Sequence, residues 1–336
     1  MLRFLTAGES HGKCLIGILE GMVSNLPLSE ADINKELARR QEGYGRGERM
    51  KIEKDTVEIL SGLRKGKTIG SPIALMINNK STEFFDQVVT KLRPGHADLA
   101  GALKYNTGDI RNILERSSAR ETAMRVAIGA ICKKFLAQFK VIVSSKVEEI
   151  GGEKNKPRFN AVIDEAKEAL DSVGGIFEIK IVNVPAGLGS HVHYDRRLNA
   201  LLASALMSIP AIKGVEVGLG FEASRHRGSK VHDEIFYEKG KFVHKTNNAG
   251  GIEGGMTNGE PIILKAAMKP IATLVKPLKS VDFKSKKATS AHIERADTCA
   301  VEAAAVIGEA MAAFVLTDAF LQKFGGDSLE EIRWRL

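Results

Sequence analysis

The sequence has few cysteines and few aromatic residues, and both shortages limit what the protein can be. The 336 residues include three cysteines, Cys14, Cys132 and Cys299, and these lack the spacing of a metal site. A disulfide framework is therefore not expected, which makes the reducing cytoplasm the expected location. Aromatic residues make up 6% of the chain, whereas glycine is frequent, with 33 residues. This composition favours close packing of helices on sheets and glycine-rich loops.

Signals for a membrane or for nucleic acid are also weak. The first residues, MLRFLTAGESHG, reach glycine and charged residues too early for a signal peptide. Residues 299–324 are apolar, but they include Glu302, Glu309 and Asp318, which predicts a buried helix rather than a membrane span. The 49 Lys and Arg against 41 Asp and Glu give a net charge of +8, and the basic residues are dispersed. We expect small anions as ligands, with neither a membrane nor nucleic acid as a partner.

Alternating helix and strand patterns predict a single α/β domain over residues 1–336, because no low-complexity linker divides the chain. Ser29 is expected to cap a helix over residues 30–40. The pair Asn258 and Gly259 is expected to form a hairpin turn before a strand. Strands are predicted at residues 3–7, 14–19, 57–61, 71–77, 141–146, 177–182, 214–218 and 261–267, and further helices at 160–172, 195–209 and 299–324.

One stretch, residues 115–125 (ERSSARETAMR), concentrates arginine and serine where a loop is predicted to become a helix. Ser118 and Glu121 have the spacing of a capping box, and apolar residues then recur with the helical period. Arg116, Ser117, Ser118 and Arg120 are therefore expected at a helix N-terminus, which favours an anion. The alternative is that the arginines face solvent or pair with nearby carboxylates.

Further arginines and two histidines occur in other predicted loops and turns. Residues 39–49 contain Arg39, Arg40, Arg46 and Arg49 among three glycines, so this loop could fold over an anion. Guanidinium groups bind carboxylates and phosphates in bidentate geometry. His11 and His96 stand in tight turns, and histidine titrates near neutrality, as a proton donor to a departing phosphate must. Together these residues predict an enzyme acting on a polyanionic, phosphorylated small molecule.

Three segments match common functional motifs, but the predicted elements around them, or a missing residue, exclude each motif. Residues 8–12 (GESHG) match the nucleophile elbow of hydrolases, but a strand rather than a helix follows them. Residues 66–68 (GKT) lack the earlier glycine of a P-loop. Residues 218–223 (GLGFEA) match a dinucleotide fingerprint, but no helix is predicted to open there.

Six segments in series resemble the chorismate synthase family. They are residues 8–12 (GESHG), 93–98 (RPGHAD), 116–122 (RSSARET), 248–255 (NAGGIEGG), 269–270 (KP) and 295–297 (RAD). The resemblance runs from residue 3 to about 320. It implies a fold of helices sandwiched between two antiparallel sheets, assembled as a homotetramer.

The resemblance also implies an activity. Members of the family are lyases that convert 5-enolpyruvylshikimate 3-phosphate to chorismate by a 1,4-anti elimination of phosphate, the last common step of the shikimate pathway. The reaction requires reduced FMN, with NADPH or an external flavin reductase as the source of electrons. The alternatives are a flavin- and NADPH-dependent reductase acting on another polyanionic substrate, and a protein that binds anions or nucleic acid without catalysis.

Roles for individual residues follow from the resemblance by position. His11 is similar to the acid that protonates the departing phosphate, His96 to the residue that stabilises reduced flavin near N1, and Asp297 to the aspartate that acts with flavin N5. Ala296 and Pro210 depart from the family pattern, as does the apolar run from Ile271. The flavin positions are Arg116, Ser117, Ser118, Pro210, Ala211, Gly254, Lys269, Pro270, Ile271, Ala272, Thr273 and Arg295, and the substrate or NADPH positions are Ser10, Arg39, Arg40, Arg46, Arg49 and Arg120.

Overall fold

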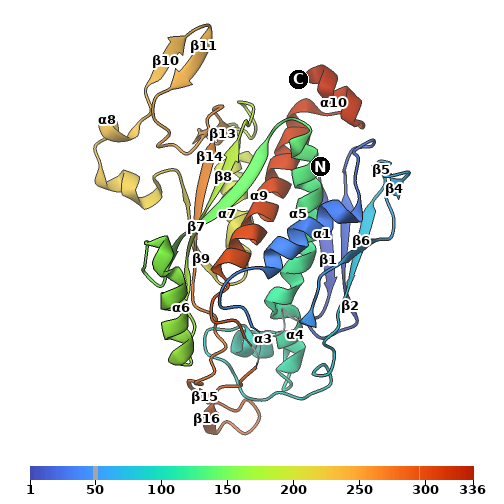
Figure 1. Ribbon diagram of the computed structural model, residues 1–336, viewed down its shortest axis with the longest axis vertical. Helices are drawn as coiled ribbons and strands as arrows, with labels where there is room; N and C mark the ends of the chain where they lie inside the picture. Colours follow the sequence, from blue (N-terminus) through green and yellow to red (C-terminus); the bar gives the residue numbers. More distant parts are fainter. Residues whose placement is uncertain (48–51, 295) are drawn as a thin grey trace.

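Two four-stranded antiparallel sheets enclose a layer of helices in the computed structural model, which describes residues 1–47, 52–294 and 296–336 (Figure 1). The first sheet has the strand order β1-β2-β6-β3 and the second has the order β7-β8-β14-β9. The predicted sandwich of helices between two antiparallel sheets is thereby confirmed. The strands are β1 (Arg3–Gly8), β2 (Cys14–Glu20), β6 (Ile73–Asn78) and β3 (Val57–Ile59), then β7 (Ile142–Ile150), β8 (Gly175–Val182), β14 (Ile262–Met268) and β9 (Ile212–Val217).

The helix layer contains α1 (Glu30–Gln41), α5 (Thr122–Ala137) and α9 (Val301–Phe324) (Figure 1). Helices α5 and α9 approach so closely that a Cβ atom on Gly129 would lie 2.3 Å from the Cβ of Ala310. Small residues at this crossing let the two backbones come together. Helix α9 is long and apolar enough to cross a membrane, but its most apolar window is 78% buried within the protein. The predicted buried helix is confirmed, and one continuous hydrophobic core joins both sheets to the helices.

Most predicted elements are present, with boundaries shifted by a few residues. Ser29 caps α1 in a capping box, because its hydroxyl accepts from the backbone of Asp32 and the Asp32 carboxylate accepts in return. The predicted hairpin turn at residues 258–259 is wrong. The two-residue turn is instead Gly254–Gly255, where both residues have positive φ, as a tight turn between antiparallel strands requires. It joins β12 (Ile252–Glu253) to β13 (Met256–Thr257).

Smaller elements gather at the two ends of the sandwich. Helices α3 and α4 and the β15–β16 hairpin lie together at one end, while the β10–β11 hairpin projects from the body at the other (Figure 1). A small second hydrophobic cluster, which includes Val89 and Ile110, forms in the region of α3 and α4. The remaining helices are α3 (Asp98–Tyr105), α4 (Arg111–Ser117), α6 (Phe159–Glu168), α7 (Leu198–Met207), α8 (Gly228–Val231) and α10 (Leu329–Arg335). The 3₁₀ helices are η1 (Ala119–Glu121), η2 (Lys156–Arg158), η3 (Tyr194–Arg196) and η4 (Gly220–Arg225). The remaining strands are β4 (Leu63–Arg64), β5 (Lys67–Thr68), β10 (Ile235–Glu238), β11 (Lys241–His244), β15 (Lys279–Val281) and β16 (Ala288–Ser290).

A carboxylate lies within the helix layer, where Glu309 on α9 is fully buried. Arg39 binds it in bidentate geometry, with both nitrogen–oxygen distances at 2.8 Å. Lys133 and Ser145 each lie 2.6 Å from a carboxylate oxygen. Burial acts to raise the pKa of Glu309, but the ion pairs and hydrogen bonds outweigh burial and lower it. The ionised carboxylate therefore links α1, α5, α9 and β7.

We expect Glu309→Gln to lower the free energy of unfolding by about 3 kcal/mol at neutral pH, because it breaks a buried ion pair. Because the pKa of Glu309 is lower in the folded state, its ionised carboxylate stabilises the protein at pH values above the pKa of the unfolded state, about 4.3 for Glu. This contribution is lost as the pH falls through the lower pKa of the folded state. The difference between the wild type and the variant should therefore shrink below about pH 4. Urea denaturation across pH checks both points, with the exposed Glu302→Gln as the control. A difference that grows on acidification would contradict the assignment.

Candidate active site

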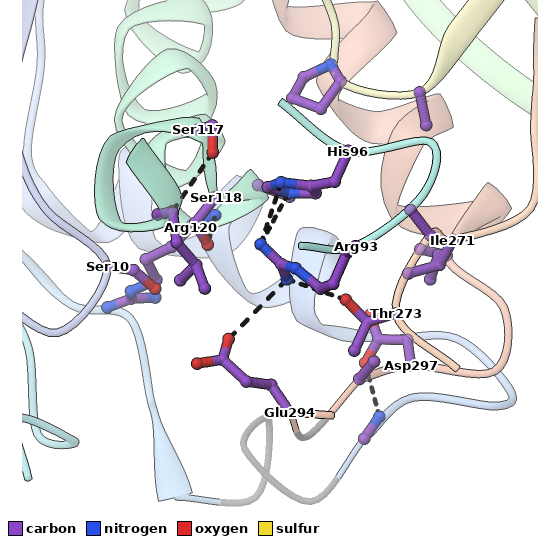
Figure 2. A pocket seen from close by; sticks show the side chains of 18 of the residues that line it. Ser10, Arg93, His96, Ser117, Ser118, Arg120, Ile271, Thr273, Glu294 and Asp297 are labelled. Carbon is purple, nitrogen blue, oxygen red and sulfur yellow. Dashed lines mark hydrogen bonds and ion pairs between the residues drawn. The ribbon is translucent and has the colours of Figure 1, made fainter. Parts of the chain in front are cut away.

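A cavity of about 370 Å³ opens at the end of the helix layer near α4 (Figure 2). Its wall is built from loops that are far apart in the sequence, and they meet where several helices begin or end. Figure 2 shows side chains from these loops converging on one space. The lining residues include Ser10, Arg40, Arg46, Gly47, Arg93, His96, Leu114, Ser117, Ser118, Arg120, Pro210, Ala211, Lys269, Ile271, Ala272, Thr273, Glu294, Ala296 and Asp297.

Two buried arginines share one carboxylate in this wall. Asp55 Oδ2 lies 2.7 Å from Arg40 Nη2, and Asp55 Oδ1 accepts a hydrogen bond from Arg120 Nη1. The side chains of all three residues are at most 4% exposed. Burial acts to raise the pKa of Asp55, but the attraction of both guanidinium groups outweighs burial and lowers it. Asp55 therefore holds two cations against the cavity.

One carboxylate does not satisfy both guanidinium groups. Within residues 1–47, 52–294 and 296–336, the buried atoms Arg40 Nε and Arg120 Nη2 make no hydrogen bond. Arg120 Nη2 has a more distant charge partner in Glu53, at 3.6 Å. Burial and the nearby cations Arg120 and Arg46 lower the pKa of Arg40, while Asp55 opposes them. Buried donors without acceptors are costly, so an anion in the cavity would be stabilised here.

Asp297 fixes the loop that follows α1. Its Oδ1 accepts from the backbone of Gly47 at 2.6 Å, and its Oδ2 lies 3.0 Å from Arg46 Nε. The backbone of Thr298 donates to Gly45 at 2.8 Å. The described part of the predicted anion-binding loop therefore lies against the segment that leads into α9, with Arg46 facing the cavity.

His96 is partly buried and forms a cluster with the buried residues Arg93 and Asp98. Nδ1 of His96 lies 2.5 Å from Asp98 Oδ1, and Arg93 Nε donates to Asp98 Oδ2 at 2.9 Å. Burial acts to raise the pKa of Asp98, but the hydrogen bonds from His96 and Arg93 outweigh it and lower this pKa. Arg93 also donates to Thr273 Oγ1 at 3.0 Å (Figure 2). The cluster places the imidazole of His96 in the cavity wall at a fixed angle.

His11 lies in a second cavity, of about 390 Å³, which shares Glu294 with the first. The preceding residue, Ser10, lines the first cavity, so the two histidines approach the site from adjacent spaces. Burial acts to raise the pKa of Glu294, but His292, Arg111 and Arg93 outweigh it and lower this pKa to about 2. Glu294 is therefore an ionised residue that lines both cavities.

The helix predicted after the central stretch is present, but it begins with a short 3₁₀ turn and follows directly on another helix. Helix α4 ends at Ser117, Ser118 is extended, and a short 3₁₀ turn precedes α5. The Ser118 hydroxyl accepts from Arg120 rather than from Glu121, and the Glu121 carboxylate binds Thr6 and Arg125. The predicted capping box is therefore wrong. Ser117, Ser118 and Arg120 do line the cavity, from the junction of α4 and α5.

Four predicted site residues line neither cavity in the described structure. Arg39 binds Glu309 in the helix layer, so it is removed from the other arginines. Arg116 donates to the backbone oxygens of Thr6 and Gly8 and so fastens the end of β1. Gly254 lies in the β12–β13 turn, and Pro270 lies between lining residues without lining the cavity itself. Two further predicted residues, Arg49 and Arg295, lie outside the described residues.

Sequence analysis missed several residues that the site contains. Arg93 and Glu294 line the cavity and stand inside or beside quoted segments, so their proximity to His96 and Asp297 was a usable signal. Asp55 had no such signal, because its two arginine partners lie 15 and 65 residues away. Among the residues with described positions, no group of three His, Cys, Asp or Glu side chains could hold a metal ion.

The fold and the arginine-lined cavity define a class, an enzyme of mixed helix and antiparallel sheet with its site at the end of the helix layer. The sequence matches the chorismate synthase family over residues 2–321, and the chain belongs to this family. A chorismate synthase of Thermoanaerobacter pseudethanolicus is 59% identical over 337 residues, covering 99% of this chain and 96% of that protein. A chorismate synthase of Aquifex aeolicus is 53% identical over 382 residues, with coverage of 99% and 96%. A crystal structure of a chorismate synthase superposes with a TM-score of 0.82 at 47% identity, covering 99% of this chain and 96% of that one.

Proposed function

We propose that this protein eliminates phosphate from 5-enolpyruvylshikimate 3-phosphate to give chorismate, with reduced FMN as its cofactor. The observation that supports this most strongly is the pair of buried guanidinium groups at the cavity, in which Arg40 Nε and Arg120 Nη2 make no hydrogen bond within the described residues. A substrate with two carboxylates and a phosphate supplies several such acceptors. Membership of the family favours this function over a reductase acting on another polyanion.

The cavity wall suits a flavin in its chemistry. Leu114, Ala211, Ile271 and Ala272 provide apolar surface for a ring system, and Lys269 provides a cation near the edge. Ser117, Ser118 and Thr273 add hydroxyl groups that can donate to ring or phosphate oxygens. When bound, reduced FMN supplies the transient electron that eases cleavage of the carbon–oxygen bond of the substrate.

The protein's own residues then bind the substrate and move its protons. Arg40, Arg46 and Arg120 hold its anionic groups. His11, from the second cavity, gives a proton to the departing phosphate. His96, held by Asp98, would stabilise the reduced flavin when that cofactor is bound. Asp297, which lines the same cavity, takes part in removing the C6 proton of the substrate. The loop that carries Arg46 keeps water from the reactants, since bulk water would weaken every charge interaction in the site.

An anaerobic assay tests this function directly. The purified protein is mixed with chemically reduced FMN and the enolpyruvyl substrate, and chorismate and inorganic phosphate are measured. We expect equal amounts of both products and no net oxidation of the flavin. Absence of phosphate release under these conditions would refute the proposed function. Replacing reduced FMN with oxidised FMN and NADPH shows whether the protein reduces its own flavin or needs an external reductase.

The assembly and location remain part of the proposal. We propose a homotetramer in the cytoplasm, with each chain forming a single domain over residues 1–336. The family match supports this assembly by analogy only. Sedimentation velocity of the purified chain, with and without FMN, tests it, and a stable monomer in both conditions would refute it.

A further inference from the structure

Glu115 on α4 holds His11 at two points. Its Oε2 accepts from the backbone N–H of His11 at 2.6 Å, and its Oε1 lies 2.8 Å from His11 Nδ1. The side chains of His11 and Glu115 are 9% and 4% exposed, so water does not compete strongly for either group. The backbone of Ser10 also donates to the carbonyl oxygen of Glu115 at 3.0 Å. This turn between β1 and β2 is therefore tied to the last turns of α4.

The contacts of His11 and a cation behind Glu115 together favour the ionised carboxylate. Arg111 Nη1 lies 3.3 Å from Glu115 Oε1 and 2.7 Å from Glu294 Oε1, and Arg111 Nε donates to the backbone of Gln87. Burial acts to raise the pKa of Glu115, but the hydrogen bonds from His11 and Arg111 outweigh burial and lower it. The other charged or titratable groups that line this cavity with His11 are Arg111, His292 and Glu294.

An ionised carboxylate can only accept hydrogen bonds, so Nδ1 of His11 must carry a proton when it faces Glu115. The nitrogen that loses and regains a proton is then Nε2. The ring of Phe84 packs edge-on against the imidazole, with centroids 5.6 Å apart and an interplanar angle of 83°, which limits rotation of the ring. The carboxylate and the phenyl ring together fix both the tautomer and the direction of the imidazole.

We infer that Glu115, held by Arg111, is a positioning residue that keeps His11 in the Nδ1–H form and aims Nε2 at the departing phosphate. The inference rests on the proposed role of His11 as the acid. In the elimination, the Nε2–H bond of the imidazolium breaks as the proton passes to a phosphate oxygen, which leaves neutral His11 with its proton on Nδ1. The Asp98 carboxylate binds Nδ1 of His96 in the same way and is itself bound by Arg93. The site therefore contains two histidine–carboxylate–arginine sets.

The isosteric variant Glu115→Gln tests this inference. Its amide satisfies the backbone N–H of His11 only by turning its NH₂ group toward Nδ1, which favours the Nε2–H tautomer. We expect kcat to fall by roughly 10- to 100-fold, the scale found when the hydrogen-bond partners of metal-binding histidines are replaced. KM should stay within about twofold, since the substrate-binding arginines are untouched. Long-range ¹H–¹⁵N spectra of protein labelled in histidine, with His11 assigned through His11→Asn, should show Nδ1–H in the wild type and Nε2–H in the variant.

The tautomer is observed without any turnover, so this result is separate from the proposed function. Nδ1–H in the wild type with no phosphate release would leave the positioning intact and refute the proposed function alone. Nε2–H in the wild type, or a Glu115→Gln variant with wild-type kcat and tautomer, would overturn the inference. Glu36→Gln is the matched control, because Glu36 also pairs with two cations, Arg39 and Lys133, but lies away from both cavities. It should leave kcat and the His11 spectrum unchanged.

Discussion

His11→Ala should lower the turnover number by roughly 10²- to 10⁴-fold, the contribution of a general acid to a proton transfer in the transition state. Phosphate leaves as a more stable species when a proton reaches its oxygen, and the imidazole of His11 supplies that proton in the proposed mechanism. The binding of reduced FMN should change little, because His11 lines the second cavity rather than the one whose wall suits the flavin. Anaerobic stopped-flow measurement of phosphate release gives the rate, and flavin titration gives the affinity.

A matched control for His11→Ala is available on the surface. His193 pairs with Asp195 at 2.9 Å, as His11 pairs with Glu115, but its side chain is 54% exposed. His193→Ala should therefore leave both the turnover number and the affinity for flavin unchanged. If His11→Ala retained a near-normal rate of phosphate release in the same assay, the acid would have to be another group.

Asp55→Asn should lower the free energy of unfolding by about 3 to 5 kcal/mol, because it leaves two buried cations without their shared charge partner. Arg40 and Arg120 would then repel each other across a space that water barely reaches. The same change should raise KM, since the two guanidinium groups would lose the geometry in which they face the cavity. Urea denaturation measures the first effect and steady-state kinetics the second.

A polyanionic ligand should restore part of the stability that Asp55→Asn loses. This effect provides a second measurement. A saturating concentration of the substrate should stabilise Asp55→Asn more than a ligand that binds only the flavin region, since its anionic groups replace the missing charge. Asp195→Asn, which removes an exposed carboxylate, is the control and should change the stability by less than about 0.5 kcal/mol. An Asp55→Asn protein as stable as the wild type would mean that the two arginines do not depend on Asp55.

Local patterns predicted the regular elements well, because each depends on residues that are close in sequence. Ser29 and the apolar period after it specify α1, and the alanine-rich run specifies α9. The errors fell where two short-range signals competed. Asn258 and Gly259 are good turn formers, but the pair Gly254–Gly255 takes the turn, since both positions there have positive φ. At Ser118 the hydroxyl caps a 3₁₀ turn through Arg120, while Glu121 binds Thr6 and Arg125, so the capping box does not form.

The segments of the site could be found from sequence, but the partners of their side chains could not. His11, His96, Asp297 and several arginines could be proposed from sequence because they stand in short segments that resemble those of the family. Arg39 and Arg40 are adjacent in the chain, yet one turns into the helix layer toward Glu309 and the other toward Asp55 and the cavity. Helical geometry separates neighbouring side chains by about 100°, so only packing decides which of the two reaches the site.

The sequence by itself determined the class of fold, the family and most of the segments that line the cavity. Those properties are encoded in composition, in periodicity and in six short segments that can be compared one by one. Only the tertiary structure decided which charges meet, such as Glu115 with His11 across 104 residues and Asp55 with Arg120 across 65. The physical reason is that a buried charge is stabilised by whichever partner the packed chain brings within hydrogen-bonding distance. Separation along the sequence does not predict that distance.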